Sequence, residues 1–93
     1  MIPAFIEYVS LEKNYSQHTV TAYRNDLLSF SDFCESSYAQ NEIVTVQYPQ
    51  IRSWIVSMVD QGISNRSINR KVSTLKSYYK FLQKTKQIDI NPL

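Results

Sequence analysis

The chain has few of the residues from which most enzyme active sites and metal centres are built. Its 93 residues include one cysteine, one histidine and one glycine. A structural zinc site usually needs four Cys or His ligands, and no spacing of such residues supports one here. A single glycine cannot build a phosphate-binding loop. The composition therefore predicts no metal, no cofactor, no small-molecule ligand and no catalysis by this chain.

The lone histidine and the lone cysteine both have structural explanations. His18 lies near Ser16 and Thr19 in the first turn of an expected helix, with no obvious carboxylate to orient it as a general base, so we expect an exposed side chain. Cys34 continues an apolar stripe and is expected to be a small core residue. It cannot form an internal disulfide, which agrees with a reducing compartment.

Long apolar runs and a targeting leader are also missing. No run approaches the roughly 20 apolar residues that a membrane-spanning helix needs, and the start MIPAFIEYV shows neither a basic leader nor a cleavage site. We therefore expect a cytoplasmic protein without membrane contact. With 93 residues, 43% of them hydrophobic, the chain is long enough for one domain with one modest core.

The spacing of apolar residues predicts four helices. They span residues 1–14, residues 16–36 with Ser16 as N-cap, a segment that Tyr48-Pro49 opens and Gly62 ends, and residues 64–84 with Ser64 as N-cap. A strand at 43–46 would lack a partner, so residues 37–47 are expected to form a loop. The fold class is therefore all-α, a helical bundle. The expected inward faces contain Ile2, Phe5, Ile6 and Val9, then Val20, Tyr23, Leu27, Phe30 and Cys34 flanked by Leu28 and Phe33, then Ile51, Trp54, Ile55, Met58 and Val59, and finally Ile68, Val72, Leu75, Tyr79 and Leu82.

Charge is distributed unevenly, and the last predicted helix carries only one sign. Residues 1–60 hold three basic and seven acidic residues, a balance of −4, whereas residues 61–93 hold seven basic and one acidic, a balance of +6. A face of one sign repels itself and so favours an anionic partner. The alternative is a solvated basic face that only keeps the domain soluble. One side of the helix holds Arg66, Arg70, Ser73, Ser77, Lys80 and Lys84, bordered by Asn69 and Lys76.

Two motifs and the closing residues resemble a known family. The first motif is Ser16-x-x-Thr19-x-x-x-Tyr23-x-x-Asp26-Leu27, followed by Phe30 and Phe33; the second runs from Gly62 to Leu82; and the chain closes on Asn91-Pro92-Leu93. In order and spacing they resemble the amino-terminal core-binding (SAM-like) domain of tyrosine recombinases and phage integrases, and the Xer-like branch is the nearest match.

The resemblance implies a fold, a partner and a missing domain. It implies a small four-helix orthogonal bundle over residues 1–85, with residues 86–93 beginning the linker to an absent carboxy-terminal catalytic domain. Such a domain grips one side of a duplex half-site during DNA integration or recombination, while the catalytic residues belong to the second domain. The expected partners are double-stranded DNA and other recombinase protomers on DNA, and this chain is expected to bind DNA without cutting it.

Ten residues are expected to contact DNA. By position, the resemblance implies Thr19, Arg24, Arg70, Ser73 and Lys76. Reasoning from the residues themselves gives an overlapping choice, because an exposed helix N-terminus and a row of cations both suit phosphates; it adds Ser64, Asn65, Arg66, Asn69 and Lys80. Asn69, Arg70 or Lys76 could also read a base edge. Asp26 is expected to cap the helix or pair with Arg24 locally, and Tyr23 to pack in the core.

Two other functions compete with DNA binding. The first is a helical protein-interaction module that mediates recombinase assembly, with patches formed by Ile2, Phe5, Ile88 and Ile90. Under that alternative, removing the cations of the last helix would matter little. The second is a small enzyme in its own right, which the lack of clustered His, Asp, Glu and Cys argues against.

Overall fold

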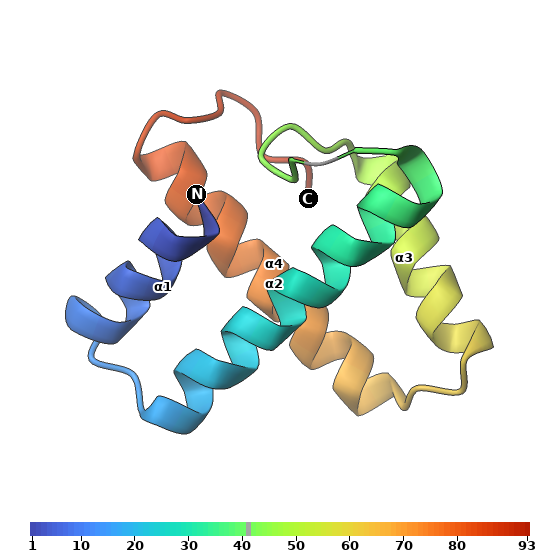
Figure 1. Cartoon of the computed structure of the whole chain (residues 1–93), viewed down its shortest axis with the longest axis horizontal. Helices are drawn as coiled ribbons and strands as arrows, with labels where there is room; N and C mark the ends of the chain where they lie inside the picture. Colours follow the sequence, from blue (N-terminus) through green and yellow to red (C-terminus); the bar gives the residue numbers. More distant parts are fainter. Residues whose placement is uncertain (41) are drawn as a thin grey trace.

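Two long helices that cross near their middles form the centre of the molecule (Figure 1). The computed structural model describes residues 1–40 and 42–93. Its helices are α1 (Ile2–Leu11), α2 (Gln17–Tyr38), α3 (Tyr48–Asp60) and α4 (Asn65–Lys84). Helices α2 and α4 cross, α1 lies beside them on one side and α3 on the other (Figure 1). No strand occurs in these two ranges, so the prediction of an all-α bundle is confirmed.

The helices begin close to where the sequence predicted. Ser16 Oγ accepts a hydrogen bond from the Thr19 amide at 3.3 Å, and Ser64 Oγ accepts one from the Ser67 amide at 3.2 Å. Each serine therefore satisfies one of the amides that the first turn of a helix leaves unpaired. Gly62 has a φ of +80° just after α3, the left-handed conformation expected of it. The end of α2 was less predictable, because there the left-handed residue is Ala39.

Aromatic rings fill the core on both sides of the crossing. The Phe5 ring of α1 stacks on Tyr23 of α2 at 6.0 Å and meets the edge of Tyr78 of α4 at 5.4 Å between ring centroids. On the other side, Phe30 of α2 lies 4.9 Å from Trp54 of α3. The core therefore joins α1 and α3 to the central pair of helices. In the part of the chain that the structure describes, no helix is long and apolar enough to span a membrane.

Some predicted core positions are wrong, and the errors on α4 have a geometric cause. Leu28 and Val59 were expected inside but are 46% and 56% exposed, whereas Tyr78 and Phe81 are buried and were not on the predicted stripe of α4. Both α1 and α3 pack near α4, so its buried face is wider than the single stripe that a four-three spacing marks.

Removing the hydroxyl group should destabilise the protein at Tyr79 but not at its neighbour Tyr78. Tyr79 Oη donates a hydrogen bond to the Ile43 carbonyl, whereas Tyr78 Oη is buried with no partner among the described residues. Tyr79→Phe leaves a buried carbonyl unpaired and should lower the free energy of unfolding by about 1–3 kcal/mol. Tyr78→Phe removes an unsatisfied group and should raise it or leave it unchanged. Urea unfolding of both variants checks this, and a destabilised Tyr78→Phe protein would contradict it.

Candidate nucleic-acid interface

The basic side of α4 is exposed along most of the helix. Its residues follow Ser64, which caps the helix, and their spacing of three and four places them on one side. Ser77 is half-buried and was not among the predicted contacts. The predicted contacts on this side are all exposed: Ser64, Asn65, Arg66, Asn69, Arg70, Ser73, Lys76 and Lys80. We call these eight residues the basic face. Its exposure follows from the sequence, because the apolar residues of α4 turn toward the other helices and leave this side uncovered.

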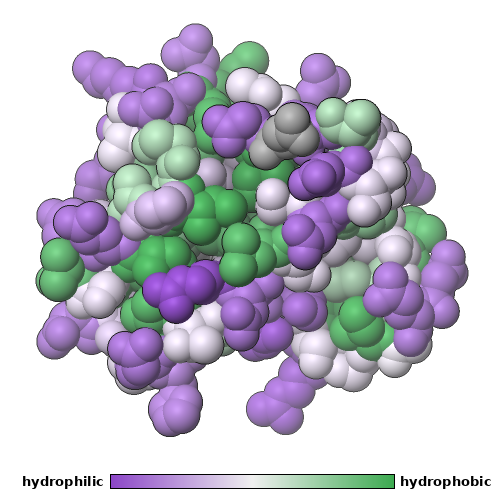
Figure 2. Space-filling model, viewed as in Figure 1, coloured by the Kyte–Doolittle hydropathy of each residue, from purple (hydrophilic) through white to green (hydrophobic). Residues whose placement is uncertain are grey.

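The N-terminal ends of α2 and α4 lie at the same edge of the molecule, the lower one in the view of Figure 1. Several hydrophilic side chains project from the lower rim of the same view (Figure 2). Thr19 is half-buried at the start of α2, and its hydroxyl lies 3.0 Å from Ser16 Oγ. Helix N-termini carry partial positive charge and unpaired amides. This edge therefore adds backbone donors to the charge of the basic face.

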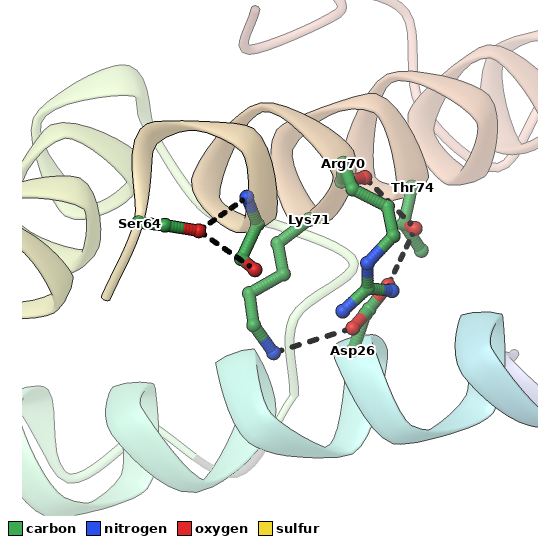
Figure 3. A network of polar contacts seen from close by, with 6 residues as sticks. Asp26, Ser64, Arg70, Lys71 and Thr74 are labelled. Atoms are coloured by element: carbon green, nitrogen blue, oxygen red, sulfur yellow. Dashed lines mark hydrogen bonds and ion pairs between the residues drawn. The ribbon is translucent and has the colours of Figure 1, made fainter.

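Asp26 does not pair with Arg24, and that prediction is wrong. The Asp26 carboxylate projects from α2 toward α4, where Oδ2 accepts from Arg70 Nη1 at 2.6 Å and from Thr74 Oγ1 at 2.8 Å (Figure 3). Its other oxygen, Oδ1, lies 3.3 Å from Lys71 Nζ. Residues two apart on a helix point in nearly opposite directions, so Asp26 and Arg24 cannot meet. Arg70, expected on a face without acids, is thus held by an acid from another helix.

Arg24 lies on the far side of α2 from this network. It lines a hollow between α1 and α2 together with Ile2 and Leu11. The structure therefore brings Thr19 to the edge with the helix N-termini but does not bring Arg24 to the basic face. A contact between Arg24 and DNA stays a prediction.

A second group of cations surrounds a hollow of about 390 Å³ between α1 and α4. Lys13, Lys80 and Lys84 line it, and the ammonium groups of Lys13 and Lys84 lie 5.8 and 5.4 Å from the centre of the Tyr8 ring. Sequence reasoning missed Lys13, because it follows α1 and has no periodic relation to α4. The only available signal was that it is one of three basic residues before Gln61.

The buried titratable groups are poorly suited to nucleophilic chemistry. Burial raises the pKa of the Cys34 thiol to about 11, and burial followed by the charge of Glu42 raises that of Tyr78 to about 12. A reactive thiol needs a lowered pKa and access to solvent, and Cys34 is fully buried. Over residues 1–40 and 42–93, no group of three His, Cys, Asp or Glu side chains could hold a metal ion. His18 is exposed, as expected.

Comparison with known proteins finds relatives along nearly the whole chain. It is 43% identical over 91 residues to the tyrosine recombinase XerC of Oceanobacillus iheyensis, 37% over 95 residues to that of Rickettsia canadensis and 35% over 91 residues to that of Bacillus subtilis. These alignments cover 98%, 96% and 98% of this chain, in the same order, but 30% of each relative. The chain thus spans about a third of the length of these relatives. No solved structure matches it.

The family model agrees with this comparison. The model for the N-terminal SAM-like domain of phage integrases matches residues 2–86, which include all four helices and the basic face. The resemblance noted from Ser16-x-x-Thr19 and from the Gly62–Leu82 motif is therefore confirmed. The chain belongs to the family of phage integrase N-terminal SAM-like domains.

Proposed function

We propose that this chain is the core-site-binding domain of a site-specific tyrosine recombinase and that it grips one side of a duplex half-site through α4 and the start of α2. The observation that carries the proposal is the row of exposed cations on the basic face. Helix α4 itself contains no acidic residue, and Arg66, Lys76 and Lys80 all reach solvent. A duplex carries one negative charge about every 1.7 Å along its axis, which such a row complements.

Phosphate contacts would supply most of the affinity and set the register. Lys76 and Lys80 would neutralise phosphates, and the capped N-termini of α2 and α4 would donate backbone N–H groups to others. An isolated half-clamp of this kind should bind in the micromolar range typical of largely non-specific binding at physiological salt. With about four to six phosphates neutralised, log K should fall against log[salt] with a slope of roughly −4 to −5.

Charge reversal on the basic face tests the proposal. Arg70 is unsuitable for this charge reversal, because a glutamate at that position would face the buried Asp26 carboxylate and destabilise the fold. Lys76→Glu avoids this problem, since Lys76 is exposed and away from the network. We expect fluorescence anisotropy with a short duplex to show at least a tenfold weaker association at low salt, and a salt slope reduced by about 1.

The matched control is Arg52→Glu on α3, which makes the same change in net charge at another exposed position. This variant should bind DNA within about threefold of the parent protein, because a distant charge is largely screened. Equal losses in both variants would mean that net charge alone matters and would reject the basic face as the interface. If the parent protein fails to bind duplex even at low salt, DNA binding itself is rejected.

The proposal assigns strand cleavage to another part of the recombinase. The buried thiol and tyrosine hydroxyls have raised pKa values, and the relatives are more than three times as long as this chain. We expect no nicking of supercoiled plasmid by these 93 residues. Reproducible nicking by the purified chain would overturn this assignment. A cytoplasmic location, where the DNA substrate lies, belongs to the same proposal.

A protein-interaction surface is the second candidate, and one observation favours it. Leu11 and Leu28 are 72% and 46% exposed beside the hollow between α1 and α2, an apolar surface that could contact another recombinase protomer. The patch expected from sequence is only partly present, because Phe5 is buried and Ile2 and Ile88 are half-buried, while Ile90 is 83% exposed. If assembly were the main role, Lys76→Glu would leave function intact.

A further inference from the structure

The Asp26 carboxylate is an unusual feature of the surface between α2 and α4. Its exposed fraction is 1%, although it is charged. Three side chains of α4 surround it, namely Arg70, Lys71 and Thr74 (Figure 3). A buried carboxylate is tolerated only when it is paired and hydrogen-bonded. The arrangement therefore fixes Asp26 and, with it, the groups that contact it.

Arg70 is the partner on which this anchoring has the largest effect. Its side chain is 50% exposed, so the guanidinium touches the buried carboxylate and also reaches solvent. A guanidinium has five N–H donors in a planar fork, and the bond to Asp26 Oδ2 uses a donor of Nη1 alone. No other hydrogen bond of the guanidinium occurs among the described residues, so its remaining donors are free for a ligand while the contact with Asp26 restricts where the side chain lies. Arg66, Lys76 and Lys80 also lie on the basic face, but no ion pair holds them among the described residues.

An anchored arginine is suited to reading a base. Arginine recognises guanine by a bidentate contact to O6 and N7 in the major groove, and a guanidinium that is already anchored loses less freedom when it makes that contact. Asparagine pairs with adenine instead, and lysine acts as a flexible point charge. Of the three candidate base readers, Asn69, Arg70 and Lys76, only Arg70 combines the chemistry for guanine with an ion pair that anchors its side chain.

We propose that Asp26 is a positioning residue that holds Arg70 as a guanine-reading fork in the major groove. The inference rests on the proposed function, because it requires α4 to face the duplex. It also explains why a DNA-binding face would place a carboxylate against its own arginine. Asp26 lowers the attraction of this face for phosphates, so its effect on non-specific affinity is unfavourable. Its benefit lies in selectivity between bases.

The test selects bound sequences from a pool of randomised duplexes and compares variants. After selection the parent protein should favour guanine over each of the other bases at one position by about fivefold or more, the lower range for one bidentate contact. Asp26→Asn should lose this enrichment while it binds the unselected pool as tightly as the parent or more tightly, because its net charge rises by one. If Asp26 had only a structural role, Asp26→Asn would weaken binding to all sequences equally and would not remove the preference for guanine at one position.

Two variants on α4 complete the design. Arg70→Lys keeps the charge and can still pair with Asp26, but it lacks the fork, so it should fold and lose the guanine enrichment. This variant keeps the test decisive if Asp26→Asn proves unstable by circular dichroism. Lys71→Met removes the other cation beside Asp26 without touching the Arg70 contact, and it should retain the enrichment.

The outcomes separate this inference from the function on which it rests. Guanine enrichment that persists in Asp26→Asn or in Arg70→Lys overturns the positioning role. A parent protein that binds duplex without preferring guanine at any position overturns it as well, while it leaves the core-site-binding function standing. A parent protein that binds no duplex overturns both.

Discussion

Asp26→Ala is expected to lower the free energy of unfolding by about 2–3 kcal/mol. The substitution removes the acceptor of three donors on α4 and leaves two cations without their counter-ion. Breaking a fully buried pair costs about 3–5 kcal/mol, but Arg70 is half-exposed and regains water, so the expected loss is smaller than that range. Urea denaturation should show the midpoint falling by roughly 1–2 M with little change in slope.

Asp32→Ala provides the matched control for this prediction. Asp32 is on the same helix and is exposed, and no ion pair involves it in the described residues. The same chemical change there should alter stability by less than about 0.5 kcal/mol. An Asp26→Ala protein as stable as Asp32→Ala would show that packing alone joins α2 to α4 and that the ion pairs add nothing.

The helices could be predicted because their signals are local. Ser16 and Ser64 cap helices three residues before the amides they accept from, and Gly62 takes the positive φ that ends a helix. Exposure of Leu28 and Val59 could not be predicted in this way. Whether an apolar residue at the edge of a stripe is covered depends on where the neighbouring helix lies, and that position is set by contacts distant in sequence.

The sequence predicted which cations of the candidate site are exposed, but it did not predict the ion pair between the helices. Periodicity alone placed Arg66, Lys76 and Lys80 on one exposed side of α4, because a solvent-facing row needs no partner. The pairing of Asp26 with Arg70 joins residues 44 positions apart, and nothing in the local pattern distinguishes that partner from Arg24, which is nearby in sequence. The boundary between a domain of residues 1–85 and a linker beginning at residue 86 likewise stays a prediction.

Alkaline pH should unfold the protein between about pH 9 and pH 12. The pKa of Cys34 is raised from 9.0 to about 11 and that of Tyr78 from 10.0 to about 12, while burial raises the pKa of Tyr79 as well. Because the folded protein keeps these protons more tightly than the unfolded chain, their contribution to stability is complete below pH 9. It is lost as the pH rises toward the folded-state values, by about 2–3 kcal/mol for each two-unit shift.

The loss is large relative to the stability of a domain of this size, about 5–14 kcal/mol, so we expect helical circular dichroism to vanish cooperatively. Tyr78→Phe removes one of the titrating groups and should move the midpoint to higher pH. Tyr15→Phe makes the same change at a tyrosine that is 41% exposed and should leave the midpoint where it is. If the two variants unfold at the same pH, the Tyr78 hydroxyl does not contribute to the transition, and the ionisation of Cys34 and Tyr79 must account for it.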